Sequence, residues 1–232
     1  MSFLISELNG DPSLATFSSL PLLPTTVNTD LVKEAILFLK RSGLPIKPRK
    51  QWPAGGMPKY SVKGKIKPEE QAQVGMSLCI WGDAGWGGMV QEGRYQDGSF
   101  SDELIEACVA LVTKWQPSPA PTWVTAMPSL RHPNLVPDFA KSLAEALGLP
   151  FYPALDKIEH NQEQKYMANS TQQALNVDGS LAVNQENVQS GSVLLIDDIV
   201  NSKWTSTVAA WLLRHNGSGE VWPLALSQTG RD

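Results

Sequence analysis

The alternation of short apolar runs with amphipathic segments between residues 102 and 227 limits the folds open to this chain more than any other feature. The apolar runs, which predict strands, lie at 122–128, 149–155, 192–197 and 220–227. Helical spacing of apolar residues predicts helices at 102–115, 134–148 and 205–217. Strands that alternate with helices form mostly parallel sheets with right-handed crossovers. We therefore predict an α/β domain over residues 101–232, in which helices flank a mostly parallel sheet.

The first hundred residues have a different character. Residues 31–43 show helical spacing and end at a glycine, so we expect an N-terminal arm and helix over residues 1–43. Many Gly and Pro residues then separate short apolar runs, such as 76–81, which indicates small strands joined by turns. We expect residues 44–100 to form a small β-rich, basic subdomain. Within it, we interpret 81-WGDAGWGG-88 as a packed turn.

Composition excludes several classes of protein. No apolar run approaches the roughly 18 residues that span a bilayer, and the first ten residues lack the basic start and apolar core of a signal peptide. Cys79 and Cys108 stand far apart among apolar residues, which favours buried thiols over a disulfide. Two cysteines and three scattered histidines show no zinc-ligand spacing. We expect a cytoplasmic protein without a membrane partner.

Basic residues are concentrated near the N-terminal end of the chain. Between Lys40 and Lys67 there are nine Lys or Arg residues and no Asp or Glu, whereas the rest of the chain carries ten basic and 23 acidic residues. This asymmetry suggests a negatively charged partner, and DNA is one candidate for residues 40–67. Trp52 and Tyr60 in this stretch could stack on bases. The alternative is a solvated basic loop with no partner.

The segment 192-SVLLIDDIVNSKWTSTVAAWLL-213 carries the clearest chemistry. It places Asp197 and Asp198 at the carboxyl end of a predicted strand, where open α/β sheets bind ligands. We expect these acids to face water without a basic partner, and to accept hydrogen bonds from a diol or to bind Mg²⁺. The hydroxyl-rich segment 201–207 then begins a helix, which suits phosphate. Together these sites fit a ribose 5-phosphate; the alternative is that they only cap the helix.

The segment 193-VLLIDDIVNSKWT-205 resembles the phosphoribosyl pyrophosphate motif of type I phosphoribosyltransferases. The segments 124–151 and 164–183 resemble the pyrophosphate loop and the flexible loop of the ComF-like branch. Short sequence segments such as PRKQWP, GDAGWG and WVTAMPSLRHP resemble the phosphoribosyltransferase-like C-terminal region of some bacterial RecQ-type DNA helicases. The resemblance covers roughly residues 44–228, and residues 193–208 are its most specific part.

The resemblance implies a role for each matching position. Asp197 and Asp198 would hold the ribose hydroxyls and, indirectly, Mg²⁺, which would enter with phosphoribosyl pyrophosphate and carry much of its charge. The 5′-phosphate would be bound by Asn201, Ser202, Lys203, Trp204 and Thr205. The pyrophosphate loop would consist of Met127, Pro128, Ser129, Leu130 and Arg131. Residues 157–173 would form a mobile cover, from which Lys157 or Lys165 could meet the pyrophosphate.

Two departures from the family pattern bear on activity. The phosphate loop has Ser202-Lys203-Trp204 where the family commonly has Thr-Gly-Ala or Thr-Gly-Gly. A non-glycine residue in a left-handed conformation there costs on the order of 1 kcal/mol, and the bulk of Trp204 could fill part of the site. The flexible loop has residues 169–173 where ComF-like chains usually carry an arginine. These changes put turnover in more doubt than fold or ligand binding.

Three functions therefore remain open on sequence grounds. The chain is an active phosphoribosyltransferase with an unknown nucleophile, a ligand-binding domain that regulates a DNA-processing partner, or a DNA-interaction module with a vestigial site. It contains no G-x-x-x-x-G-K-[ST] nucleotide loop and no DEAH-like box, so we do not expect it to unwind DNA itself. It would be either a fragment of a larger helicase or a free-standing relative of its C-terminal part.

Overall fold

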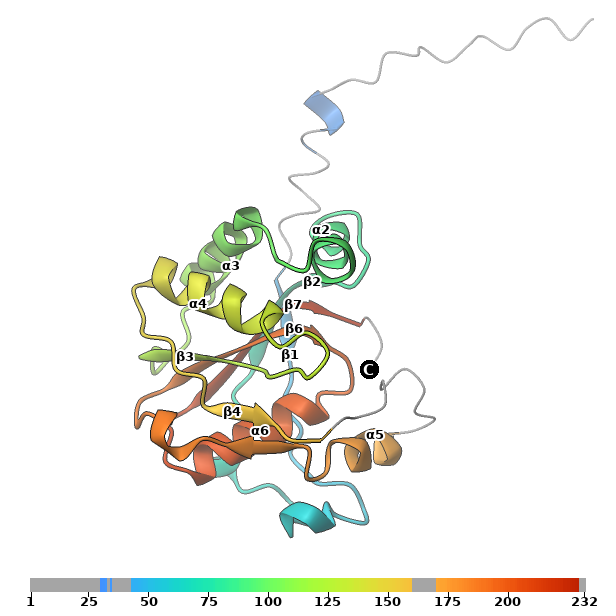
Figure 1. Ribbon diagram of the computed structural model, residues 1–232, viewed down its shortest axis with the longest axis vertical. Coiled ribbons are helices and arrows are strands. Elements are labelled where there is room, and N and C mark those ends of the chain that lie inside the picture. The colour runs from blue at the N-terminus through green and yellow to red at the C-terminus, as the bar shows by residue number, and fades with distance from the viewer. Residues whose placement is uncertain (1–29, 33, 35–42, 160–169, 230–232) are drawn as a thin grey trace, which may run out of the picture.

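A five-stranded sheet occupies the centre of the computed structural model, which describes residues 30–32, 34, 43–159 and 170–229 (Figure 1). Its strands are β1 (Leu44–Ile46), β2 (Gly75–Ile80), β3 (Trp123–Ala126), β6 (Val193–Val200) and β7 (Val221–Gln228). Their order is β1-β2-β7-β6-β3, and only the β1–β2 pair is antiparallel. The mostly parallel α/β fold is therefore confirmed.

Helices cover both faces of this sheet (Figure 1). One face carries α2 (Gly87–Glu92), α3 (Asp102–Trp115) and α4 (Leu135–Leu147), and the other carries α5 (Ser170–Val177) and α6 (Trp204–His215). Strand β6 shows why both faces need cover, because Val193 and Leu195 pack toward α6 while Leu194 and Ile196 pack toward α3 and α4. A strand that is apolar on both sides is typical of a parallel sheet buried between helices.

The predicted strand at 149–155 is interrupted in the structure. Only Phe151 forms a parallel bridge, to Val124 of β3. Pro150 and Pro153 flank it, and a proline has no N–H to continue a ladder. The chain then turns away and forms β4 (Leu155–Lys157), which pairs antiparallel with β5 (Leu181–Val183) in a separate two-stranded sheet. This small sheet lies beside α6 (Figure 1).

Residues 44–100 contribute less β-structure than the sequence predicted. Strands β1 and β2 join the edge of the main sheet, and the other described residues of this stretch form isolated bridges, turns and short helices, among them the 3-10 turns Pro58–Tyr60 and Pro68–Glu70. Between the two strands, the chain buries Trp52 and Met57 against α6, with the Trp52 ring 6.0 Å from that of Trp211. These residues thus cover one face of the larger domain. The boundaries at 43/44 and 100/101 remain predictions.

The sequence predicted a packed turn at 81–88, and residues 81–86 form turns before α2 begins at Gly87. The Asp83 carboxylate accepts hydrogen bonds from the N–H groups of Gly85 and Gly87, at 3.0 and 2.8 Å, and so fixes the start of α2. A π-helical turn, Gly93–Asp97, follows α2 and ends at Gly98, whose φ of +69° suits glycine. This unpredicted turn carries Arg94 toward the carboxyl edge of the sheet.

Other expectations concern the N-terminus and the cysteines. Residues 30–32 and 34 are helical, and the rest of the predicted arm and helix lies outside the described residues. Cys79 and Cys108 are buried, free thiols, as predicted. Within the described part of the chain, none of the helices combines the length and the apolar character that a bilayer crossing requires.

Candidate functional site

A pocket of about 460 Å³ opens where four parallel strands end. It is lined by the residue that follows β2 (Trp81), by the loops after β3 and β6, by the residue after β7 (Thr229) and by the first turn of α6. The carboxyl ends of parallel strands meet at one edge of a sheet, which is where such sheets bind ligands. The acid pair lies near this edge, as predicted, although β6 continues past both acids to Val200.

The two acids lie in this pocket but are not alone. Asp198 is only 7% exposed and forms an ion pair with Arg94 through its Oδ2 atom. Its Oδ1 atom accepts a hydrogen bond from Ile199 N–H at 2.8 Å, and Asp197 Oδ1 accepts one from Asp198 N–H at 2.9 Å. The expectation of acids without a basic partner is wrong, because the fold brings in an arginine from a distant part of the chain. A buried carboxylate needs such a partner.

The protonation of the site is set by burial. Burial raises the pKa of Asp197 to about 7, although the positive charges of Arg94 and Lys157 oppose this rise. Burial also lowers the pKa of Lys157 to about 8, against the attraction of Asp197. Both groups therefore change charge close to neutral pH, which is common at functional sites.

The expected phosphate loop lies between β6 and α6. Asn201, Ser202, Lys203 and Thr205 all line the pocket. Lys203 adopts the left-handed conformation, with φ at +66°, and its carbonyl accepts hydrogen bonds from the hydroxyls of Ser206 and Thr207 at 3.0 and 2.7 Å. The loop thereby leads into the first turn of α6, whose N–H groups and dipole favour an anion.

Trp204 takes a different place from the one its bulk suggested. Its side chain is 2% exposed, belongs to the core around α6 and does not line the pocket. Its Nε1–H donates to Ser170 Oγ at 3.0 Å, and the guanidinium of Arg49 lies 4.3 Å from its ring. Arg49 Nε–H also donates to the carbonyl of Ser202 at 2.9 Å. Trp204 therefore supports the phosphate loop from behind and leaves the cavity open.

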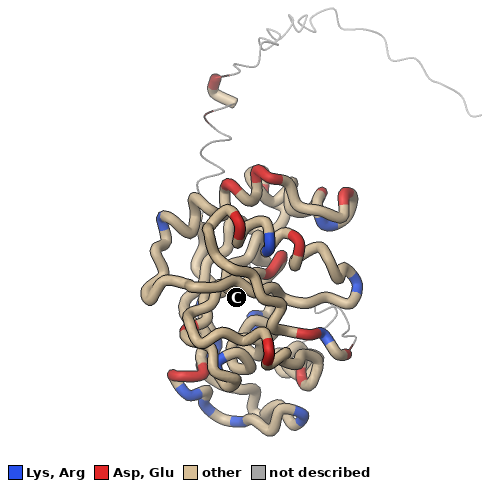
Figure 2. Tube along the Cα trace, turned by 60° about the vertical axis from the view of Figure 1, so that its left-hand side comes forward, with Lys and Arg blue, Asp and Glu red and all other residues tan. Residues whose placement is uncertain are grey.

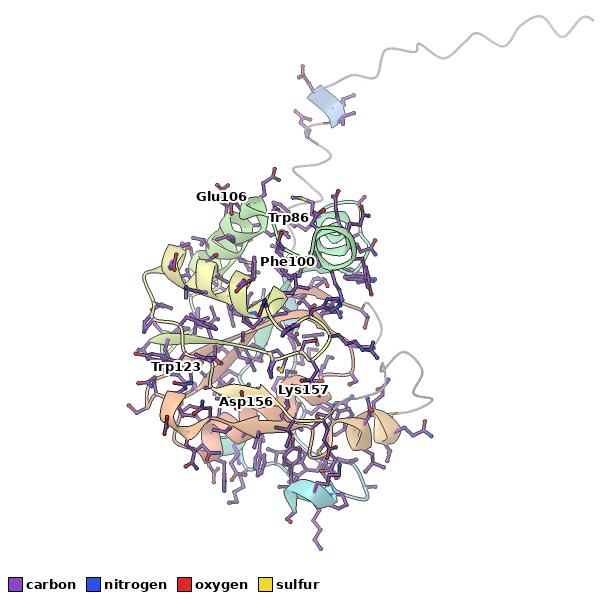
Figure 3. The ribbon with its side chains drawn as sticks, in the orientation of Figure 1. Trp86, Phe100, Glu106, Trp123, Asp156 and Lys157 are labelled. Carbon is purple, nitrogen blue, oxygen red and sulfur yellow. The ribbon has the colours of Figure 1, made fainter. Side chains whose placement is uncertain are left out.

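The loop after β3 supplies most of its predicted residues. Met127, Pro128, Ser129 and Arg131 line the pocket, whereas Leu130 is 42% exposed and does not. Lys157 also lines it from the end of β4, next to the exposed Asp156 (Figure 3). Lys165 and most of the predicted mobile cover lie outside the described residues.

Several lining residues were missed by the sequence reasoning. They are Trp81, Arg94, Tyr95, His132, Asn176 and Thr229, together with four apolar or hydroxyl neighbours of the predicted set, Val136, Ile199, Val200 and Ser206. Trp81 is the last residue of the predicted strand at 76–81, so the strand-end rule applied to that run would have found it. Arg94 and Tyr95 carry no such signal, because they follow a short helix that the sequence did not predict. Trp81 and Tyr95 contact edge to face, with ring centroids 5.9 Å apart.

The residues present do not fit a metal ion that the protein coordinates directly. Among the described residues, no three His, Cys, Asp or Glu side chains come together in a way that could hold one. Both oxygens of Asp198 are engaged, by Arg94 and by Ile199 N–H, and the Asp197 carboxylate also accepts hydrogen bonds from the backbone at Asp198 and Ile199. The protein itself thus engages both carboxylates, whereas Mg²⁺ usually needs one or two available carboxylates together with ligand phosphates.

Comparisons with known proteins give partial likenesses. No family model matches the sequence, and no curated protein sequence matches it. A crystal structure of adenine phosphoribosyltransferase aligns at 16% identity over 56% of this chain and 69% of that chain, with a TM-score of 0.40. The adenine phosphoribosyltransferase of Leishmania donovani aligns at 21% identity over 55% of this chain and 54% of that chain, with a TM-score of 0.37.

A third structure is the glutamine phosphoribosylpyrophosphate amidotransferase of B. subtilis, in complex with ADP and GMP. It aligns at 25% identity over 48% of this chain and 24% of that chain, with a TM-score of 0.31. The present chain thus spans about half of the Leishmania enzyme and about a quarter of the B. subtilis enzyme.

Proposed function

We propose that this protein binds phosphoribosyl pyrophosphate, or a nucleotide through its 5′-phosphate, in the pocket at the carboxyl edge of the sheet. The observation that carries the proposal is that one cavity gathers the acid pair 197–198, the loop 201–205, the loop 127–131 and Lys157. The loop 127–131 and Lys157 lie far in the sequence from the acid pair and the adjoining loop 201–205. Their convergence on one cavity is harder to explain by helix capping than by a ligand with a diol and several phosphates.

The chemistry of each group suggests its part of the ligand. Asp197 Oδ2 and the remaining lone pairs of Asp198 can accept hydrogen bonds from two adjacent hydroxyls. The loop 201–205 and the first turn of α6 suit the 5′-phosphate. Lys157 and Arg131 are further cations of the pocket lining, and Ser129 adds a hydroxyl, so these residues suit pyrophosphate.

Transfer of the phosphoribosyl group is the reaction that such a site supports best. A nucleophile with a lone pair forms a bond to C1′ of the ribose while the bond from C1′ to pyrophosphate breaks. The pyrophosphate leaves with the bonding electrons, and the proton of the nucleophile passes to solvent. Carboxylates near the ring stabilise positive charge at C1′, and Lys157 and Arg131 stabilise the leaving group. The nucleophile itself is not specified by the lining residues.

Calorimetric titration with phosphoribosyl pyrophosphate, with and without Mg²⁺, tests the proposal. The double variant Asp197→Ala with Asp198→Ala should lose at least about 100-fold in affinity, because two charge-assisted hydrogen-bonding groups are removed. Asp156→Ala, which removes an exposed acid next to Lys157, is the matched control and should bind like the wild type. Unchanged affinity in the double variant would end the proposal.

A second candidate function is nucleic-acid binding by the basic stretch. Lys47, Lys50, Lys59, Lys63, Lys65 and Lys67 are exposed. The part of the stretch that follows β1 lies at the lower end of Figure 1, and Lys and Arg positions gather there in Figure 2. Ion pairs within the described chain engage Lys59 with Glu159 and Lys67 with Glu70, and none engages the other four. A row of uncompensated lysines is the electrostatic feature that favours DNA.

The structure changes two details of this candidate. Trp52 is 4% exposed, and the hydroxyl of the half-buried Tyr60 donates to the carbonyl of Leu181 at 2.8 Å, so neither ring is presented for base stacking. Arg49 is engaged with Ser202 and Trp204. Lys40 and Arg41 lie outside the described residues. Any DNA contact in the described part therefore depends on the exposed lysines.

We also infer a biological setting from the motif resemblance. The sequence segments that resemble the C-terminal region of RecQ-type helicases support assignment to the ComF-like phosphoribosyltransferase branch. They also support a helicase partner in DNA repair or recombination. In that setting, a domain that senses the ligand without turnover is the alternative to an active transferase. The free, buried thiols of Cys79 and Cys108 fit the cytoplasmic location that we expect. Co-purification with a RecQ-type helicase would test the partnership.

A further inference from the structure

Arg94 occupies the position at the acid pair where a cation would be expected. Its Nη1 atom forms the ion pair with Asp198, and its charge also lies close enough to act on Asp197. Its Nε–H is buried and has no hydrogen-bond partner within the described chain. The ion pair with Asp198 is therefore the contact that holds the guanidinium in the pocket.

The element that carries Arg94 is built to place it there. Arg94 is the second residue of the π-helical turn Gly93–Asp97, and such turns are frequent at functional sites. Gly93 sits so tightly that a Cβ atom would come within 2.7 Å of the Ser99 carbonyl and 2.8 Å of the Phe100 ring. A side chain at 93 would therefore push the turn away from the body of the protein. The direction of Arg94 depends on this close contact.

The charges around the acids leave little place for a divalent ion. The cavity is lined by two carboxylates, Asp197 and Asp198, and by four cationic side chains, Arg94, Arg131, Lys157 and Lys203. The lining therefore carries more cationic than acidic side chains before any metal enters. A divalent ion at the acid pair would have to displace the arginine or sit beside it, and like charges at short range repel.

We propose that Arg94 is the resident cation of the carboxylate pair and takes the place that a divalent metal would otherwise hold there. This proposal rests on the proposed function for its ligand, because the pair is there to hold a ribose diol. It predicts that the protein binds the ribose 5-phosphate part of its ligand without a metal. Any Mg²⁺ that enters with phosphoribosyl pyrophosphate would then be bound by the phosphates of the ligand.

Titration of Mn²⁺, followed by electron paramagnetic resonance, tests the proposal without any ribose ligand. The wild type should show no Mn²⁺ site that depends on the acid pair. Arg94→Gln should gain a site, and Asp198→Asn added to that variant should abolish it. Arg94→Lys, which keeps the charge, should still exclude Mn²⁺. Arg214→Gln removes an arginine that pairs with Glu220 away from the pocket, and should behave as the wild type.

The second measurement uses ribose 5-phosphate, which has the diol and one phosphate but no pyrophosphate. The affinity of the wild type should agree within about twofold in excess EDTA and in excess Mg²⁺. Arg94→Gln in EDTA should bind about tenfold or more weakly, because unshielded carboxylates repel the phosphate, and Mg²⁺ should restore part of the loss. Thermal melting of each variant shows that it is folded.

Each result has a defined meaning. A Mn²⁺ site in the wild type that Asp198→Asn removes would overturn the proposal, as would a Mn²⁺ site in Arg94→Lys, because charge would then not be what excludes the metal. If the wild type binds neither phosphoribosyl pyrophosphate nor ribose 5-phosphate, the proposed function fails. The Mn²⁺ result would still decide the role of Arg94, so the two failures are distinguishable.

Discussion

At the scale of single residues, the site depends on two carboxylates whose burial costs free energy of folding. Asp197 is half-buried and Asp198 almost fully buried, and one arginine serves both. The sequence showed the pair and its place at a strand end, because apolar residues run directly into it. It could not show Arg94, because that contact is made by the tertiary fold. A charge pair that is distant in sequence leaves no local pattern.

The raised pKa of Asp197 makes a prediction about stability. Its pKa is higher in the folded protein, about 7, than its ordinary value of 3.8. The folded state therefore holds the proton more tightly, and the free energy of unfolding falls as the pH rises from about 4 to about 7. Asp197→Asn removes the buried charge, so it should stabilise the protein at pH 8 by about 1–3 kcal/mol and have little effect near pH 4.

Urea unfolding at the two pH values measures this difference. Asp156→Asn, at an exposed acid on the neighbouring strand β4, should change stability little at either pH. If Asp197→Asn is equally destabilised at both pH values, the carboxylate makes a structural hydrogen bond, and its stabilisation exceeds the free-energy cost of burying the charge. Asp197→Asn should also weaken ligand binding, so this residue would trade stability for function.

At the scale of elements, the phosphate loop and α6 make the next prediction. Lys203 holds a φ of +66°, which L-residues rarely adopt and glycine adopts freely. Lys203→Gly should therefore be more stable than Lys203→Ala by about 1 kcal/mol. Both variants lose the same charge, so the difference between them reports the backbone alone. Chemical denaturation measures it.

The same two variants separate backbone from charge in ligand binding. If the lysine charge contacts the 5′-phosphate, both variants should lose affinity for phosphoribosyl pyrophosphate by a similar factor, on the order of tenfold. A loss in Lys203→Ala alone would assign the role to loop conformation. Equal stability of the two variants would mean that the left-handed backbone carries no cost here.

Elements with strong periodicity could be predicted from the sequence. The helices at 102–115, 134–148 and 205–217 became α3, α4 and α6 within about two residues at each end, because one face of each packs on the sheet. The strand at 149–155 was wrong because its prolines block the ladder. The turn Gly93–Asp97 and helix α5 were missed, because both are short and polar, and their positions depend on packing that local sequence does not encode.

At the scale of the whole molecule, residues 44–74 have two faces. Their apolar side chains, Trp52, Met57 and Ile66, pack in the core beside α6, while most of their lysines face solvent. The charge count of the sequence found the basic stretch but not its orientation, because glycines and prolines hide any helical or strand period. The exposed lysines are therefore presented on the side of this segment that is turned away from the core.

The salt dependence of DNA binding tests whether these exposed lysines contact DNA. Lys63→Glu with Lys65→Glu reverses two exposed lysines that the described chain leaves without acid partners. If they contact phosphates, log affinity should fall less steeply with log salt, by a slope change of about 2, since each phosphate contact contributes about 0.9. Lys114→Glu with Lys141→Glu, at exposed positions on α3 and α4, changes net charge equally and is the control. Arg49 is left intact because its reversal would disturb the phosphate loop. An equal effect of both pairs would mean that overall charge, and no particular surface, governs binding, and undetectable binding by the wild type would make the basic stretch a solvated loop.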